Sequence, residues 1–243
     1  MLEYKSTAVV IAAGGSADRF GGNIPKQFLD LGGEPVVIRA LKPFLKEPEL
    51  KTVAVAVHRD WMDWMKEQLC RRGWDKKVKV VPGGAHRGES VFNGLKAIKD
   101  TDIVHIHDAA RPFVNLRMIT EAAKRAWEYG GAAVAIPVKD TIKKENEGII
   151  AATFSRDNLW RVQTPQSFRT KVILKAYKIA MKLGFQGTDD CVLLEKLTGI
   201  KVRLIQGSEL NIKITTPEDF LLAQAITRML DEIEEKSTDV SHP

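Results

Sequence analysis

The sequence predicts an α/β fold: a Rossmann-like, mostly parallel sheet with helices on both faces and a projecting β-hairpin arm. Short apolar runs alternate with amphipathic stretches along most of the 243 residues. This β-α-β-α order is typical of parallel sheets, whose strands are joined by helices that cover the sheet. One segment, residues 139–154, breaks the alternation and has the pattern of a hairpin. We therefore expect one layered domain with a single excursion.

The expected strands are short apolar runs, and the expected helices are the amphipathic stretches that join them. The strands are Ala8–Ala13, Thr52–Val57, Val78–Val81, Ile103–His107, Ala132–Pro137 and Val202–Ile205. The helices are Val36–Leu45, Trp61–Cys70, Glu89–Ile98, Leu116–Tyr129, Thr170–Leu183, Asp189–Leu197 and Pro217–Glu234. With no internal repeat or low-complexity linker, residues 1–235 form one expected domain and residues 236–243 a frayed tail.

The hairpin is expected within Lys139–Phe154. Thr141–Lys143 and Ile149–Phe154 are its predicted strands, and Glu145–Gly148 is its predicted turn. A projecting hairpin has edges that need cover, and a second subunit could provide it. The alternative is a surface excursion that packs on its own domain, and the residues alone favour neither.

Composition narrows the classes of ligand. Lys and Arg total 37 against 31 acidic residues, a net charge of +6 that favours anionic ligands. The basic residues are dispersed and lack interleaved aromatic residues, so nucleic-acid binding is not indicated. Cys70 and Cys191 lie far apart, which argues against structural zinc and a disulfide framework. No apolar run has transmembrane length and no signal-peptide pattern is present, so we expect a cytoplasmic protein without membrane partners.

The most informative segment runs from Val9 to Gln27. An apolar strand leads into a loop rich in small residues, and Arg19 and Lys26 follow. Glycines let the backbone approach an anion, and successive N–H groups can form an anion-binding concavity. The loop matches neither a P-loop nor a GxGxxG fingerprint. It is suited to a polyphosphate.

Ligands of open parallel sheets gather beyond the carboxyl ends of the strands. Five segments are predicted to meet there in one crevice, and each of them carries at least one cation. They are Gly14–Lys26, Gly83–Ser90, His107–Pro112, Lys139–Thr141 and Asn211–Lys213. This convergence predicts a phosphate-handling site.

Several residues allow more than one interpretation. Asp108 could cap a helix or pair with Arg111, or it could lie near Mg²⁺ or a substrate hydroxyl. Ser90 could cap a helix and also contact a phosphate. His105 and His107 point to the same face of a strand, but no nearby residue completes a metal site, so we expect both to be buried and hydrogen-bonded.

Other residues are assigned a role in packing or in ligand contact, and none is assigned a role as a covalent nucleophile. The cluster around Trp61, Trp64 and Leu69 is expected in the core or an interface, not as a base-stacking platform. No Ser-His-Asp or Cys-His arrangement is evident, so a covalent nucleophile has little support. Arg19 and Lys26 could be solvated charges, but their place on a glycine loop favours ligand contact.

Taken together, the motifs resemble those of the 2-C-methyl-D-erythritol 4-phosphate cytidylyltransferase family. The similar segments occur in the same order over nearly the whole chain. They are AAG…R…PKQ at 12–27, GGAHRGESV at 83–91, HDAARP at 107–112, PVKDTIK at 137–143, FSRDNLW at 154–160, QTPQSF at 163–168, TDD at 188–190 and NIKITTPED at 211–219.

The resemblance implies transfer of a cytidylyl group from CTP to the phosphate of methylerythritol 4-phosphate, with release of pyrophosphate. It assigns Arg19, Lys26 and Lys213 to the triphosphate and to the charge that develops on the α-phosphate. It also implies Mg²⁺ or another divalent cation, held mainly by the triphosphate, with Asp108 as the candidate protein ligand.

The resemblance also implies binding residues for each substrate. Those around the cytosine and ribose are Ala12, Ala13, Gly14, Gly83 and Ser90. Those for the acceptor are Asp108, Arg111, Thr141, Arg156 and Thr188. In the family the arm is exchanged within a homodimer, so residues 139–156 are expected at an interface where Thr141 and Arg156 complete the partner's site.

One departure and three alternatives accompany the resemblance. The loop Gly14–Arg19 is one residue longer than the family's GxGxR and lacks its second glycine, although Arg19 keeps the family spacing to Lys26. The closest alternative is a cytidylyltransferase for another polyol phosphate, such as ribitol 5-phosphate. A sugar-1-phosphate nucleotidyltransferase is more distant. A non-catalytic nucleotide-binding protein would not need the cations Arg19, Lys26 and Lys213 together.

Overall fold

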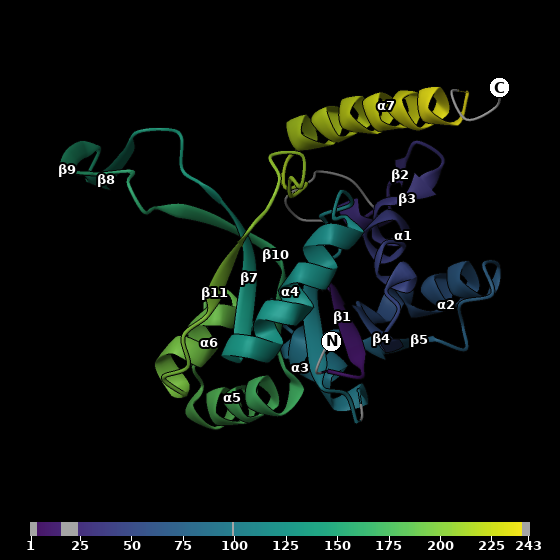
Figure 1. The fold of residues 1–243 in the computed structure, drawn as a ribbon, viewed down its shortest axis with the longest axis horizontal. Coiled ribbons are helices and arrows are strands. Elements are labelled where there is room, and N and C mark those ends of the chain that lie inside the picture. The colour runs from purple at the N-terminus through teal and green to yellow at the C-terminus, as the bar shows by residue number, and fades with distance from the viewer. Residues whose placement is uncertain (1–3, 16–23, 99, 240–243) are drawn as a thin grey trace.

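A seven-stranded sheet forms the centre of the computed structural model, which describes residues 4–15, 24–98 and 100–239 (Figure 1). Its strand order is β11-β7-β10-β6-β1-β4-β5. The strands are β1 (Thr7–Ala13), β4 (Leu50–Val57), β5 (Val78–Pro82), β6 (Ile103–Asp108), β7 (Gly131–Pro137), β10 (Trp160–Arg169) and β11 (Arg203–Gln206). Only β10 runs antiparallel to its neighbours, so the predicted mostly parallel sheet is confirmed.

Strand β10 was not predicted, because its sequence is largely polar. It lies between β6 and β7, and its side chains at Gln163, Thr164, Gln166 and Ser167 are buried. Each of these four residues makes a hydrogen bond to a residue at least 20 positions away in the chain. Polar groups can be buried when they are paired in this way. No local pattern could show such pairing.

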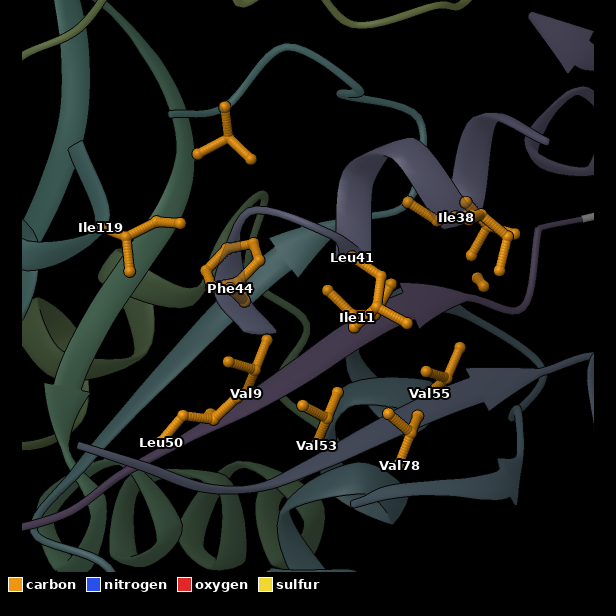
Figure 2. Packing of buried hydrophobic residues seen from close by; sticks show 14 of the residues in the cluster. Val9, Ile11, Ile38, Leu41, Phe44, Leu50, Val53, Val55, Val78 and Ile119 are labelled. Carbon is orange, nitrogen blue, oxygen red and sulfur yellow. The ribbon is translucent and has the colours of Figure 1, made fainter. Parts of the chain in front are cut away.

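Helices cover both faces of the sheet, as predicted. One face carries α1 (Val36–Leu41), α2 (Met62–Cys70) and α4 (Leu116–Tyr129). The other carries α3 (Arg87–Ala97), α5 (Thr170–Leu183) and α6 (Asp190–Leu197). Because side chains alternate along a strand, β1 contributes Val9 and Ile11 to the first face and Val10 to the second. Figure 2 shows the first cluster, where Ile11 lies near Leu41 and Val9 lies near Leu50.

The helix boundaries agree with the sequence in most places. Helix α1 is an exception, because it ends at Leu41 and not at Leu45. Pro43 has no backbone N–H to continue the ladder, and Phe44–Lys46 forms a separate 3₁₀ turn. The indole rings of Trp61 and Trp64 pack on Phe28, which confirms that this cluster belongs to the core.

Helix α7 (Pro217–Asp239) closes the fold at the end opposite α5 and α6 (Figure 1). It runs further than predicted, so residues 236–239 belong to the helix and not to a frayed tail. Its Ala223 and Ile226 share a buried cluster with Leu31 of β2 (Asp30–Leu31), a strand paired with β3 (Glu34–Pro35). None of the helices in the described part of the chain has the length and hydropathy of a membrane span.

The arm projects from the body of the molecule, as predicted (Figure 1). It consists of β8 (Ile142–Asn146) and β9 (Ile149–Phe154), and every residue in both strands is exposed. The predicted four-residue turn was wrong. The turn is the pair Glu147 and Gly148, both with positive φ, which suits the twist of a hairpin.

Candidate active site

A cavity of about 590 Å³ opens beyond the carboxyl ends of β1 and β6, beside the start of α3. Four of the five segments that were expected to converge contribute to its lining. The lining residues are Ala12, Ala13, Gly14, Gly15, Lys26, Gln27, His58, Gly84, Ala85, His86, Arg87, Ser90, Asp108, Ala109, Ala110 and Lys213. The expectation was wrong for Lys139–Thr141, which leads into the arm, with the Lys139 ammonium 2.8 Å from Glu209.

Glycines let two loops meet at the floor of this cavity. A Cβ at Gly14 would lie 2.7 Å from Ser90 Oγ, and a Cβ at Gly83 would lie 3.2 Å from Gly14 Cα. The predicted nucleotide-binding residues Gly14, Gly83 and Ser90 therefore do come together. Gly83 supports the floor, whereas its neighbour Gly84 lines the cavity. Packing this close requires the absence of side chains.

Ser90 is a loop anchor and not a helix cap. Its Oγ accepts a hydrogen bond from the Gly84 N–H at 3.0 Å and donates one to the His86 carbonyl at 3.2 Å. Helix α3 begins at Arg87, two residues before its predicted start, and His86 caps it through Nδ1. Of the two uses considered for Ser90, the helix cap was therefore wrong, and contact with a phosphate stays a prediction.

The loop after β1 is held by Gln27. This side chain is 3% exposed, and its Nε2 donates to the carbonyls of Ala13 and Gly15 at 2.9 and 2.8 Å. The adjacent Lys26 lines the cavity. The predicted phosphate ligand Arg19, with the rest of the longer loop, lies outside the described residues. Gln27 belongs to the PKQ motif, but its role becomes visible only in the folded chain.

Asp108 is the centre of a charge cluster. Its Oδ1 lies 2.8 Å from Arg87 Nε, and its Oδ2 lies 2.8 Å from Lys213 Nζ. The expected partner Arg111 is more distant, with 3.9 Å between Arg111 Nε and Asp108 Oδ2. Burial alone would raise the pKa of Asp108, but Arg87 and Lys213 hold it well below its usual range. Asp108 is therefore a permanent anion among cations.

Both carboxylate oxygens of Asp108 thus already face cations. Within the described ranges, no group of three or more His, Cys, Asp or Glu side chains could hold a metal ion. The described side chains do not form a preformed site for a divalent cation. Such an ion would need oxygen ligands from elsewhere, and a bound triphosphate is one source.

Arg87 connects this cluster to a second buried carboxylate. Its Nη1 and Nη2 donate to the two oxygens of Asp190 at 3.1 and 2.8 Å. Asp190 is fully buried and also accepts a hydrogen bond from the Tyr177 hydroxyl. Sequence reasoning assigned no role to Arg87 or Asp190, although both lie in the motifs at 83–91 and 188–190. The residues are 103 positions apart, so only the fold reveals the pair.

The two histidines of β6 are buried and hydrogen-bonded, as predicted. His107 Nε2 donates to the Arg111 carbonyl at 3.0 Å, so its Nδ1 accepts from the Thr164 hydroxyl at 2.9 Å. Burial lowers the pKa of His107 to about 4, which keeps the ring neutral. His105 lies between Ser167 and Glu47, at 2.7 and 3.3 Å. Both rings therefore join β6 to its neighbours.

The predicted acceptor residues fall into three places. Asp108 and Arg111 lie together at the carboxyl end of β6. Thr188 lines a smaller cavity of about 160 Å³, which shares Arg87 with the larger one. Thr141 and Arg156 lie at the base of the arm, where Arg156 Nη1 donates to the Lys139 carbonyl. Neither arm residue lines the cavity of its own chain, and their role in a partner's site stays a prediction.

The geometry agrees with comparisons to known proteins. Residues 7–229 match the family model described as 2-C-methyl-D-erythritol 4-phosphate cytidylyltransferase. The chain belongs to this family. The cytidylyltransferases of Bacillus pumilus and Geobacter metallireducens are similar to it, with 43% and 44% identity over 218 and 224 residues. These matches cover 90% of this chain in each case, and 95% and 96% of the two relatives.

The fold of this chain is also similar to solved structures of cytidylyltransferases. A 4-diphosphocytidyl-2C-methyl-D-erythritol synthase from Anaerococcus prevotii has a TM-score of 0.81 and 28% identity, over 93% of this chain and 96% of that one. The cytidylyltransferase of Thermus thermophilus has a TM-score of 0.76 and 30% identity, over 90% and 98%. The fold expected from the sequence is therefore that of the cytidylyltransferase family.

Proposed function

We propose that this protein transfers a cytidylyl group from CTP to 2-C-methyl-D-erythritol 4-phosphate and releases pyrophosphate, in the cytoplasm. The observation that carries this proposal is the family match over residues 7–229, four of whose motifs line one cavity with Lys26, Asp108 and Lys213 among the lining residues. A cavity of about 590 Å³ has the size of a small-ligand site. The product, 4-diphosphocytidyl-2-C-methyl-D-erythritol, serves isoprenoid biosynthesis.

The reaction needs charge stabilisation more than proton transfer. An oxygen of the acceptor phosphate attacks the α-phosphorus of CTP, and the bond to the bridging oxygen of the pyrophosphate breaks. The nucleophile is already an anion, so no strong general base is required. Lys26 and Lys213, together with Arg19, would stabilise the negative charge on the α-phosphate. The position of Lys26 and Lys213 in one lining supports this role.

The nucleotide would lie over the end of β1. Ala12, Ala13 and Gly14 present backbone groups there, and Ser90 holds the opposite loop close. Fixed N–H and C=O groups can select the amino-pyrimidine edge of cytosine without charged side chains. The close approach of the two loops supports binding of the base and ribose at this end.

The acceptor would lie beside Asp108 and Arg111. Two arginines suit a dianionic phosphate, because each guanidinium can offer two parallel N–H groups. Arg111 is one, and Arg156 from a partner's arm is the second. A homodimer through residues 139–156 would therefore complete the site, with Thr141 contributed in the same way. The complete exposure of β8 and β9 supports an arm that reaches another subunit.

Mg²⁺ or another divalent cation would enter with the triphosphate. When bound it neutralises phosphate charge and fixes the geometry of the chain of phosphates. Because Arg87 and Lys213 occupy both oxygens of Asp108, phosphate oxygens would supply most of its ligands.

The test is pyrophosphate release by the purified protein with CTP and Mg²⁺. Methylerythritol 4-phosphate is compared with ribitol 5-phosphate at matched concentrations. Release with methylerythritol 4-phosphate alone is expected. Release with ribitol 5-phosphate alone would keep the mechanism and overturn the acceptor. Binding of CTP without release with either acceptor would overturn the proposed reaction.

A further inference from the structure

Arg87 lies between the two cavities and lines both of them. Its guanidinium uses three nitrogens on two carboxylates: Nε donates to Asp108, and Nη1 and Nη2 donate to Asp190. The two carboxylates come from different elements, since Asp108 ends β6 and Asp190 begins α6. Arg87 therefore joins the reactive end of the sheet to the start of a helix.

The far end of this connection is rigid. Asp190 is fully buried, and besides Arg87 it is held by the Tyr177 hydroxyl. The N–H groups of Asp190 and Cys191 both donate to the buried Gln166 side chain, at 3.0 and 3.1 Å. A bidentate pair with such a fixed carboxylate determines the orientation of the guanidinium as well as its position. Arg87 thus approaches Asp108 from a defined direction.

The near end of the connection includes a more exposed cation. Lys213 pairs with the other oxygen of Asp108, and its side chain is 40% exposed, compared with 31% for Arg87. An entering phosphate can draw the Lys213 ammonium away from Asp108 only if the carboxylate keeps another cation. Arg111, at 3.9 Å, is a weak substitute. Arg87 is the fixed cation that remains with Asp108.

We propose that Arg87 is a positioning residue: anchored on Asp190, it neutralises and orients Asp108, and thereby leaves Lys213 available to the phosphates of the substrates. This inference rests on the proposed cytidylyl transfer and deepens it. Without Arg87, Asp108 would retain Lys213 as its own ion-pair partner. The phosphate would then compete with a carboxylate for the ammonium group.

A double-mutant cycle tests this coupling. Arg87→Gln is expected to lower kcat by roughly ten- to hundredfold, by analogy with the loss of a residue that orients a metal ligand. In a Lys213→Gln background the same change is expected to cost less than about threefold, because Lys213 is no longer there to be freed. Turnover is calculated per molecule of folded enzyme, whose concentration is determined by titration. An equal cost in both backgrounds would overturn the proposal, since a purely structural role would act independently of Lys213.

Further variants distinguish the loss of a positioning role from misfolding. Arg87→Lys keeps one charge but loses the fork, so partial recovery of kcat relative to Arg87→Gln is expected. The double variant Arg87→Gln with Asp190→Asn leaves no unpaired buried carboxylate at α6, and it is expected to fold and to show the same loss of turnover. The matched control is Arg125→Gln on α4, an arginine that also bridges two carboxylates, Glu121 and Glu128, away from both cavities. Wild-type turnover is expected for this control, and wild-type turnover in the double variant would contradict the proposal.

A crystallographic comparison separates this inference from the proposed function. In Arg87→Gln the Asp108 carboxylate is expected to turn away from its present orientation, and in Arg87→Lys to keep it. An unchanged Asp108 in Arg87→Gln would overturn the positioning role. If the wild type bound CTP but released no pyrophosphate with either acceptor, the proposed function would fail, and these structures would still decide the role of Arg87.

Discussion

The cavity at the end of the sheet and the arm differ in whether their side chains have partners within the chain. Around the cavity, charged and polar groups are paired within the chain: Asp108 with Arg87 and Lys213, Gln27 with two carbonyls, and His107 with Thr164. In the arm all residues of β8 and β9 are exposed, including Ile149 at 72% and Ile150 at 63%.

This difference shows what one chain can complete alone. The proposed nucleotide end of the site is built from contacts within the sheet and its loops, so it is expected to exist in a monomer. No residue of β8 or β9 is buried on its own chain, and isolated two-stranded hairpins have marginal stability in water. Its exposed isoleucines and the predicted acceptor residues Thr141 and Arg156 would find contacts in the proposed second subunit.

The largest expected effect on activity comes from replacing Lys26, which lines the cavity. Lys26→Ala should reduce turnover more than it weakens acceptor binding, with a loss of roughly 3–4 kcal/mol of transition-state stabilisation, by analogy with an oxyanion donor. Steady-state measurement of pyrophosphate release gives kcat and KM separately. Near-normal turnover would remove Lys26 from the mechanism.

Mixing two inactive variants tests whether the arm of one subunit completes the cavity of another, because one variant is defective in the cavity and the other in the arm. Arg156→Ala alone should mainly impair use of the acceptor. After subunit exchange with Lys26→Ala, half of the dimers are hybrids with one intact site in two, so roughly a quarter of wild-type activity is expected. Exchange is verified with differently tagged chains. If exchanged mixtures stay inactive, the arm does not complete the partner's site.

The free energy of unfolding should also depend on pH through the buried His107 beside the cavity, and not through the exposed arm. The pKa of His107 is about 4 in the folded chain, against 6.5 as the ordinary value. Between these values the unfolded chain binds a proton that the folded chain does not, so stability falls as pH decreases from 6.5 to 4. The full shift corresponds to about 3 kcal/mol. Urea unfolding at a series of pH values should show a smaller loss for His107→Gln; an identical loss would mean that other groups cause it.

The smallest expected effect concerns two adjacent glycines of the nucleotide loop. Gly14→Ala places a Cβ 2.7 Å from Ser90 Oγ, and the resulting overpacking should lower the unfolding free energy by about 1–3 kcal/mol. At Gly15 a Cβ would meet no atom of the described residues within 4 Å, so Gly15→Ala is the matched control, with an unfolding free energy near that of the wild type. Denaturant unfolding compares them. Equal stabilities would show that the loops are less tightly packed than the structure indicates.

The elements with strong local patterns could be predicted from sequence. Helices α4 and α5 begin and end where their periodicity indicates, because each has a continuous apolar stripe that only one face of the sheet can bury. The glycine loop and the lysines at strand ends also indicated the cavity, because parallel strands bring their carboxyl ends to one edge. The arm was visible as a break in the alternation.

Contacts between distant segments could not be predicted in this way. β10 is a polar sequence whose burial depends on partners in β6, α6 and the segment after β11, and Arg87 meets Asp190 across 103 residues. Sequence alone determined the layered fold, the family and the place of the cavity, since these follow from periodicity and local motifs. Only the tertiary structure decided which charges pair, because electrostatic and hydrogen-bond energies depend on distances that chain folding sets.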